Sequence, residues 1–339
     1  MAGPPPKDWS VDPATAGARE VIPGLWRLRL PLAWEAINHV NAYLIEGDAV
    51  TLVDCGTAGH PTCATALEVA LEATGHALED VKQLVLTHVH SDHMGLAQLV
   101  LERSGAELCA HPDDAHFYDA MREPDRIVAA RERRARQEGV PEERLPVYRT
   151  ADEELEGALA PVTPTHLLTD GVTVATGLGP FEVHETPGHC PSHVCLLQRD
   201  TGVAIVGDLI CPAFVPWLDY GYSADPMAET FASLDVLERL DARLALPGHG
   251  RPIEHVQGTI EDTRNGFAQR LGDTRRALAQ GPAGAYELAT RIWGEEPDLQ
   301  ATGHMTELLS YLRYLRGLGE VTRTTVEDGT YRYTNGGSR

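Results

Sequence analysis

The sequence predicts an α/β fold, because short apolar runs that suit strands alternate with longer amphipathic stretches that suit helices. Two observations carry this prediction. Several of the apolar runs end in a turn that is followed by a histidine or an aspartate. Between these runs, apolar residues recur at helical spacing, and Pro226 stands where the first turn of a helix accepts proline.

The individual elements follow in chain order. In the first half, the apolar runs predict strands at 25–32, 40–45, 49–53 and 82–86. In the second half, they predict strands at 172–175, 181–185, 194–197, 203–206 and 244–247. Helical periodicity predicts helices at 61–74, 92–103, 125–138 and 226–240.

The most informative segment follows the strand expected at 82–86. It reads HVHSDH, so four metal-competent side chains lie within six positions: His88, His90, Asp92 and His93. Neutral imidazoles and a carboxylate are ligands that Zn²⁺ or a similar ion accepts. Because a turn at a strand end is not bound to the alternation of faces, these side chains can point toward one place.

Three further candidate ligands lie downstream, each directly after a glycine: His189, Asp208 and His249. Seven ligand-type residues suit two metal ions, with Asp208 between them. The expected groups are His88, His90 and His189 on one ion, and Asp92, His93 and His249 on the other. Two ions roughly 3.5–4 Å apart can hold a bridging hydroxide that is nucleophilic at neutral pH. A histidine-rich loop with ordinary structural roles is the alternative, but the ordered set of motifs favours the metal site.

These residues resemble the metallo-β-lactamase-fold hydrolases. The matching segments are LVDCG at 52–56, HVHSDH at 88–93, PGH at 187–189, GD at 207–208 and PGHG at 247–250, and they span roughly residues 20–255. The resemblance implies an αβ/βα four-layer sandwich with both metals at one edge of two facing sheets. It also implies that Asp54 orients metal ligands, with a strand-end turn as the alternative role. Asp208 stands where the best-known zinc β-lactamases carry Cys, so the chain looks more like the glyoxalase II, lactonase and nuclease branches.

Composition limits the class of protein. The chain has 339 residues with 42% hydrophobic residues, and no apolar run approaches the ~18 residues of a membrane span. The N-terminus lacks the pattern of a secretory signal, so a cytoplasmic protein without membrane partners is expected. Six scattered cysteines suggest reduced core residues. Cys190 adjoins His189, and its side chain either approaches the metals or only packs in the turn.

The charge is strongly negative and unevenly spread. The formal net charge is −22, and residues 251–339 contribute 11 basic against 12 acidic side chains, which leaves almost all of the excess in residues 1–250. Such an acidic surface repels polyphosphates at long range, so nucleic acid is not an expected partner.

The chain divides into a flexible segment at 1–19, a catalytic domain at 20–255 and a C-terminal domain at 256–339. An insertion at 112–165 interrupts the catalytic domain with an Arg-rich helix. It forms either a lid over the pocket or a solvated flap whose charges pair internally. The aromatic segment at 209–222 lines either a substrate cleft or the core. His193 either donates to a leaving group or has a structural role, and His39 either supports the metal ligands or is structural.

The C-terminal domain is expected to hold helices at 257–279, 286–293 and 306–318, followed by a hairpin at 321–325 and 331–334. This order resembles the winged-helix appendage of a subgroup that includes β-lactamase-like endoribonucleases and fungal acyl-carrier-protein thioesterases. The helix before the hairpin carries only Arg313 and Arg316 as basic residues. We therefore favour a structural module, or one that forms a homodimer, over a nucleic-acid reader.

The resemblance implies a metal-dependent hydrolase with two Zn²⁺ ions per chain, or Fe or Mn in their place. The expected substrate is a small-molecule ester or thioester, lactones included, with Asp92 acting as both ligand and proton shuttle. A metal-dependent endoribonuclease is the alternative. A non-catalytic winged-helix nucleic-acid-binding protein with a residual metal site, or oxidative chemistry with one iron, are further alternatives.

Overall fold

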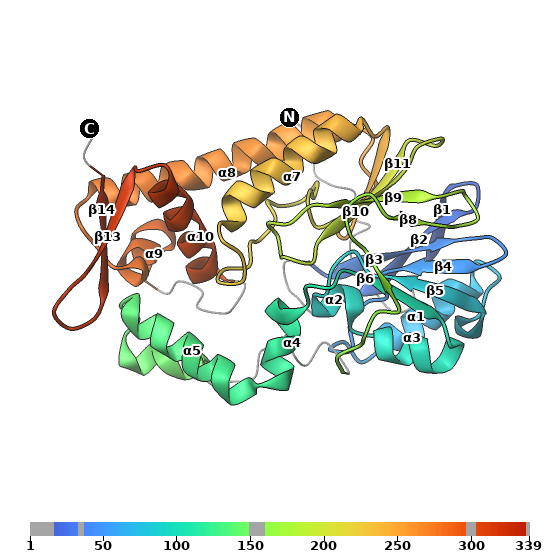
Figure 1. The fold of residues 1–339 in the computed structure, drawn as a ribbon, viewed down its shortest axis with the longest axis horizontal. Helices are drawn as coiled ribbons and strands as arrows, with labels where there is room; N and C mark the ends of the chain where they lie inside the picture. Colours follow the sequence, from blue (N-terminus) through green and yellow to red (C-terminus); the bar gives the residue numbers. More distant parts are fainter. Residues whose placement is uncertain (1–16, 33–36, 149–159, 296–302, 337–339) are drawn as a thin grey trace.

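The computed structural model describes residues 17–32, 37–148, 160–295 and 303–336. The first of two large sheets has seven strands in chain order (Figure 1). They are β1 (Ala18–Ile22), β2 (Leu25–Pro31), β3 (His39–Ile45), β4 (Val50–Val53), β5 (Val81–Val85), β6 (Glu107–Ala110) and β7 (His166–Leu167). The pairs from β1 to β4 are antiparallel, and those from β4 to β7 are parallel.

The second sheet has five strands in the order β12-β11-β10-β9-β8. They are β8 (Thr173–Val174), β9 (Phe181–Glu185), β10 (Val194–Gln198), β11 (Val203–Gly207) and β12 (Leu244–Pro247). Only the β11–β12 pair is parallel among these described strands. Strands β5, β11 and β12 therefore deliver the segments that follow them to one edge of the two sheets.

The two sheets face each other, and helices cover their outer faces (Figure 1). In β3, Ala42 and Leu44 pack in the core with α1 (Cys63–Glu72) and α3 (Ala97–Ser104). Tyr43 and Ile45 point the other way, into the core between the sheets. Strands β10 and β11 alternate between that core and the one under α7 (Pro226–Leu240) and α8 (Val256–Ala279). The predicted αβ/βα sandwich is confirmed.

Most predicted elements are present, with two corrections. The helix expected at 92–103 is two helices, α2 (Ser91–Met94) and α3, because Gly95 and Leu96 interrupt it. At this break, the Leu96 N–H donates to the carbonyl of Gly56, and the Cys55 N–H donates to the carbonyl of His93. These contacts attach the turn to the loop after β4. Most of the segment predicted to be flexible lies outside the described residues, whereas its last two residues belong to β1.

The insertion contains α4 (Ala115–Arg122), α5 (Pro124–Gln137) and the 3₁₀ helix η3 (Glu142–Tyr148), and a second 3₁₀ turn, η2 (Leu78–Asp80), precedes β5. Several of its arginines pair inside the insertion, as the flap alternative predicts: Arg126 pairs with Asp119, and Arg136 with Glu132. The acidic stretch at 152–156 lies outside the described residues. A lid function stays a prediction.

The C-terminal elements appear in the predicted order: α8, α9 (Ala285–Trp293), α10 (His304–Gly317), and the hairpin of β13 (Val321–Thr325) and β14 (Tyr331–Asn335). The winged-helix resemblance stays a prediction. Helix α8 spans two cores, because Ile260 packs under the second sheet whereas Phe267 packs among the C-terminal helices. Ala135 of α5 and Leu218 of the loop after β11 belong to the same C-terminal core. In the described ranges, none of the helices has the length and hydropathy to cross a bilayer.

A buried carboxyl joins the insertion to this C-terminal core. Glu138, just after α5, is 2% exposed, and its two carboxyl oxygens share the hydrogen bond that the hydroxyl of Tyr333 donates. Burial raises the pKa of Glu138 from 4.5 to about 7, although the bond from Tyr333 acts in the opposite direction. Ionisation of Glu138 therefore opposes the native state.

We expect Glu138→Gln to stabilise the protein above neutral pH. In the wild type, the favourable protonated state is fully kept below pH 4.5 and is lost as the pH rises to about 7, a difference of roughly 3 kcal/mol. The glutamine keeps an acceptor for Tyr333 but does not ionise. Thermal unfolding is measured between pH 4 and 9. The difference in stability between Glu138→Gln and the wild type should widen up to about pH 7 and stay constant above it. Glu142→Gln, an exposed carboxyl in the same insertion, is the control; equal pH profiles for all three proteins would refute the assignment.

Candidate metal centre

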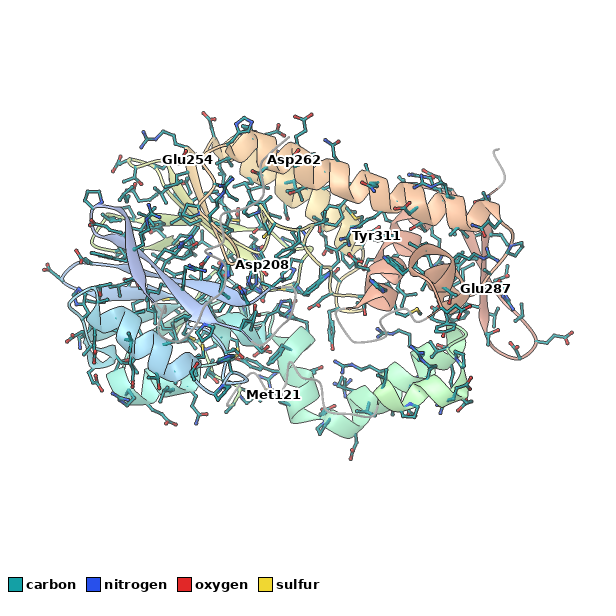
Figure 2. All side chains as sticks on the ribbon, turned by 180° about the vertical axis from the view of Figure 1, so that it is seen from behind. Met121, Asp208, Glu254, Asp262, Glu287 and Tyr311 are labelled. Carbon is teal, nitrogen blue, oxygen red and sulfur yellow. The ribbon has the colours of Figure 1, made fainter. Side chains whose placement is uncertain are left out.

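The seven predicted ligands lie together at one edge of the sheets, near the middle of the molecule, where Figure 2 labels Asp208. Six of them are buried, and His90 has 11% of its side chain exposed. The segment after β5 supplies His88, His90, Asp92 and His93. His189 follows β9, Asp208 follows β11, and His249 follows β12.

Their ligand atoms include two clusters with the expected members, and His88 also lies within 4.8 Å of His93 and Asp208. In the first, Nε2 of His189 lies 2.9 Å from Nδ1 of His90, and His88 joins them within 4.8 Å. In the second, Nε2 of His249 lies 3.1 Å from Oδ2 of Asp92, and His93 completes the group. Each group offers three donor atoms within the reach of one cation.

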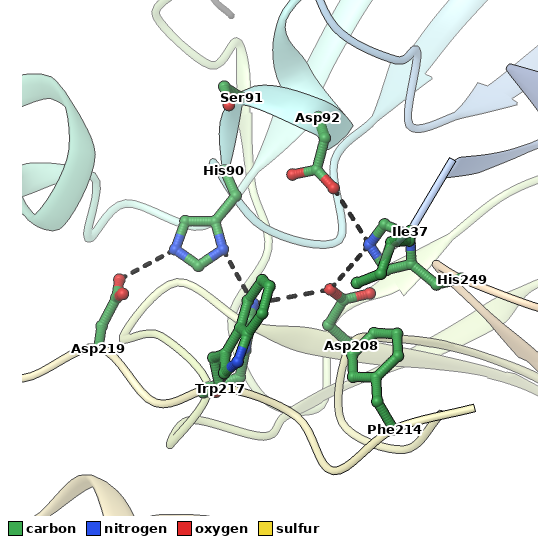
Figure 3. Close-up of a pocket in the computed structure, with 10 residues that line it drawn as sticks. Ile37, His90, Ser91, Asp92, Asp208, Phe214, Trp217, Asp219 and His249 are labelled. Carbon is green, nitrogen blue, oxygen red and sulfur yellow. Dashed lines mark hydrogen bonds and ion pairs between the residues drawn. The ribbon is translucent and has the colours of Figure 1, made fainter. Parts of the chain in front are cut away.

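Asp208 lies between the two groups, as predicted. Its Oδ2 is 3.2 Å from Nε2 of His249 (Figure 3) and 3.8 Å from Nε2 of His189. Its Oδ1 is 3.5 Å from Nε2 of His93. A single carboxylate therefore faces histidines of both groups. This is the arrangement that a bridging ligand requires.

Each of the five histidines binds a protein acceptor through the ring nitrogen that points away from the cluster. Nδ1 of His249 bonds the carbonyl of His39 at 2.9 Å, and Nε2 of His90 bonds the Asp219 carboxylate at 2.9 Å. The remaining contacts are His88 Nδ1 to Thr87 Oγ1, His93 Nδ1 to Asp54 Oδ2, and His189 Nδ1 to the carbonyl of Trp217. Carbonyls and carboxylates only accept, and the Thr87 hydroxyl already donates to Asp54 and so accepts from His88. The outer nitrogen of each ring therefore carries a proton, and the inner nitrogen is the one that faces the place of a cation.

Several inner atoms are buried without a hydrogen bond. They are Nε2 of His88, Oδ2 of Asp92, Nε2 of His93 and Oδ1 of Asp208. Such orphaned polar atoms cost free energy unless something binds them, and divalent cations bind this set of donors. The residues present therefore fit a binuclear metal site.

Electrostatics supports the same conclusion. Burial lowers the pKa of His88 well below its ordinary value and that of His189 to about 4, so these rings are neutral. For His249, burial also acts to lower the pKa, but the carboxylates of Asp208 and Asp92 outweigh it and raise the pKa to about 10. Burial acts to lower the pKa of His93 as well, but the neighbouring carboxylates outweigh it and raise that pKa well above the ordinary value. Without a cation, protons on these two histidines thus balance the buried carboxylates. Metal binding would release those protons.

Asp54 ties the ends of β4 and β5 together. It has a left-handed backbone, with φ at 58°, and its carboxylate accepts hydrogen bonds from the N–H and the hydroxyl of Thr87, both at 2.8 Å. The same carboxylate accepts from Nδ1 of His93 at 2.9 Å. Asp54 thus orients a candidate ligand, in the role that the resemblance implied.

Two further residues near the cluster had alternative roles in the sequence analysis, His193 and Cys190. His193 is buried; its Nδ1 contacts the hydroxyl of Thr186 at 2.8 Å, and its Nε2 accepts the N–H of Asp208 at 3.0 Å, which favours the structural role. Gly207 is required there, because a Cβ would lie 2.6 Å from Nε2 of His193. Cys190 lies beside the first group, with its sulfur within 4.8 Å of ligand atoms of His88, His90 and His189, so both of its alternative roles stay predictions.

Asp219 and the carbonyl of Trp217 are functional groups that the sequence did not predict. They flank Leu218, which is 2% exposed and packs into the C-terminal core. One buried residue thus anchors two groups that orient histidines of the first metal group. No local pattern marks them, because His90 and Asp219 are 129 residues apart.

A pocket opens over the cluster (Figure 3). Five of the seven ligand residues line its floor, namely His90, Asp92, His189, Asp208 and His249, and three apolar side chains form its walls: Ile37, Phe214 and Trp217. Phe214 and Trp217 stack with ring centroids 6.1 Å apart. Part of the aromatic segment therefore lines the cleft, whereas Tyr220 packs against the C-terminal core.

The fold and the cluster together define a metallo-hydrolase scaffold with a binuclear metal site. Residues 37–249 match the family model of the metallo-beta-lactamase superfamily, which is more than half of the chain. The chain therefore belongs to the metallo-β-lactamase superfamily.

Three relatives illustrate the similarity. The chain is 29% identical over 304 residues to the probable metallo-hydrolase YqjP of Bacillus subtilis, covering 87% of this chain and 93% of that protein. It is 23% identical over 226 residues to the human acyl-coenzyme A thioesterase MBLAC2, covering 64% and 75%. The crystal structure of a metallo-beta-lactamase family protein from Thermus thermophilus superposes with a TM-score of 0.78 at 30% identity, covering 93% of this chain and all of that one.

We expect Asp54→Asn to weaken metal binding by roughly 10–100-fold. The amide would present N–H groups to Nδ1–H of His93, and a switch of the His93 tautomer would protonate Nε2, the atom that faces the cluster. Affinity is measured by competition with a chromogenic chelator. The matched control is Asp241→Asn, because Asp241 also has a left-handed backbone, with φ at 51°, but lies exposed at the end of α7. Equal affinities for both variants would contradict the role of Asp54.

We expect Leu218→Ala to weaken the first metal group selectively. The truncation loosens the segment that carries the Trp217 carbonyl and Asp219, so one of two metal equivalents should bind roughly 10–100-fold more weakly. Leu315→Ala is the control, since Leu315 is buried in the same core but not in this loop. Both truncations should cost about 2–5 kcal/mol of unfolding free energy. Identical metal titrations of the two variants would rule out the positioning role.

Proposed function

We propose that this protein is a binuclear metal-dependent hydrolase that cleaves a small-molecule thioester or ester, lactones included. The observation that carries the proposal is the position of Asp208 between two groups of buried ligand atoms at the floor of an apolar-walled pocket. The similarity to a protein named an acyl-coenzyme A thioesterase supports the thioester class.

The proposed ligands are the seven predicted residues, and Zn²⁺ is the proposed ion at both positions. Imidazole and carboxylate donors suit Zn²⁺, and they also accept Fe or Mn. When bound, the ions would activate a water molecule at neutral pH and polarise the substrate carbonyl.

The chain itself would supply orientation and proton transfer. Ile37, Phe214 and Trp217 exclude water and hold the acyl group against the floor of the pocket. Asp92 also lines the pocket, where we assign it to accept the proton of the attacking water and pass it to the leaving thiolate or alkoxide.

RNA cleavage is the weaker candidate. The formal net charge of −22 opposes a polyanionic substrate, and the walls of the pocket beside the ligands are apolar. The cytoplasmic location and a homodimer stay predictions.

Elemental analysis coupled to a substrate screen tests the proposal. We expect two metal equivalents per chain and turnover of thioesters or esters, and we expect Asp208→Ala to lower kcat by roughly 10²–10³-fold, because a shared ligand is lost. The control is Asp235→Ala, which removes an exposed carboxylate that pairs with Arg264. Turnover of RNA alone, or full activity of Asp208→Ala, would overturn the assignment.

A further inference from the structure

A second pocket adjoins the metal centre. The two pockets share Ile37, Phe214, Trp217 and His249, so the second continues the first. Its other lining residues are Asn38, His39, Ala213, Val215, Gly250 and Arg270. A substrate whose scissile bond lies at the metal cluster therefore has room to extend into it.

Arg270 gives this extension its chemical character. Among the described residues that line the second pocket, it alone has a permanent charge. His39 is neutral, because its Nε2 accepts a hydrogen bond from the N–H of Gly250 at 3.2 Å and so carries no proton. The pocket thus has aromatic and aliphatic walls and one guanidinium, whose planar set of donors matches a carboxylate or a phosphate.

The position of Arg270 is fixed by the C-terminal helices. Its Nη1 donates to the hydroxyl of Tyr311 at 3.2 Å and pairs with the buried carboxylate of Glu307, both on α10 (Figure 2 labels Tyr311). The Tyr311 hydroxyl donates in turn to Glu307 at 3.0 Å. Both contacts of Arg270 use the same nitrogen, and 30% of the side chain stays exposed, so further N–H groups remain for a ligand.

Close packing brings α8 to the pocket. A Cβ at Gly266 would lie 2.3 Å from Cγ2 of Val215, so glycine allows the helix to approach the loop after β11. Arg270 lies one turn further along the same face of α8. The close contact between α8 and the loop after β11 therefore also places the guanidinium of Arg270 at the pocket.

We propose that the second pocket is an anion subsite, in which Arg270 binds a carboxylate or phosphate that the substrate carries away from its scissile bond. The inference rests on the proposed function for the position of that bond. The anion belongs either to the acyl group or to the thiol or alcohol that leaves, and both sources share the chemistry that a guanidinium recognises.

Binding of matched hydrolysis products to the zinc-loaded protein distinguishes the two sources. One arm compares α,ω-dicarboxylates of four to ten carbons with monocarboxylates of equal length, and the other compares pantetheine 4′-phosphate with pantetheine. We expect calorimetry to show a preference in one of the two arms and not in the other. In that arm, the anionic compound should bind the wild type roughly 10–100-fold more tightly than its neutral or singly charged counterpart. Turnover of the corresponding thioesters is measured separately, so absence of hydrolysis refutes the proposed function without deciding the subsite.

Two variants separate recognition from folding. Glu307→Gln keeps the guanidinium and should keep the preference for the anion. Arg270→Gln combined with Glu307→Gln avoids an unpaired buried carboxylate and should abolish the preference while neutral products bind as before. If the double variant does not fold, Arg270→Lys, which keeps the ion pair but not the planar donors, should lower the preference by at least about threefold.

Two results would overturn the subsite. One is a wild type that binds the anionic and neutral members equally in both arms. The other is a preference that survives in the folded double variant or, where that variant does not fold, in full in Arg270→Lys.

Discussion

Two buried carboxylates, Asp92 and Asp208, set the conditions for the rest of the site. Burying them without compensation would cost several kcal/mol each, so positive charge must lie beside them. The fold provides it by topology, because the ends of β4, β5, β11 and β12 meet at one edge and bring histidines from distant segments around both carboxylates. In the absence of a cation, His249 is held protonated. The geometry that makes the carboxylates tolerable is therefore also the geometry that binds metal.

The histidines stay oriented because each has a fixed partner outside the cluster, and four of these partners come from two parts of the fold. Asp54 follows β4, and the carbonyl of His39 lies at the start of β3, so both belong to the first sheet. One face of this sheet packs against helices and the other against the second sheet. Asp219 and the carbonyl of Trp217 belong to a loop that Leu218 anchors among the C-terminal helices. The first metal group thus depends on the C-terminal region, whereas the second depends on the catalytic sheet. Loss of the C-terminal packing should disturb the two groups unequally.

The sequence was sufficient for the fold class and for the convergence of the seven residues, because each follows a strand-like run and the strand ends must meet. It was not sufficient for their outer partners. Asp219 follows no strand or glycine, and its contact with His90 forms only when two segments far apart in the chain pack together. The break between α2 and α3 was missed for a similar reason. The carbonyl of Gly56 accepts a hydrogen bond from the Leu96 N–H, and the periodicity of apolar residues does not indicate such a long-range bond. Local sequence patterns therefore predicted the secondary-structure elements and the ligands. The groups that orient the ligands depend on tertiary contacts, which local patterns do not contain.

The acidic surface and the cationic pocket are compatible because they act over different distances. Most of the negative charge lies in residues 1–250, where screening limits its effect to roughly 8–10 Å in physiological salt. Arg270 stands on the nearly neutral C-terminal part and would act on an anion by direct contact. Glu307 holds the guanidinium in place and balances its charge, so an anion that displaces water from the remaining N–H groups gains directional hydrogen bonds more than net attraction. Recognition of this kind selects a substrate by the position of its anionic group, and it makes the C-terminal helices part of the specificity of the pocket.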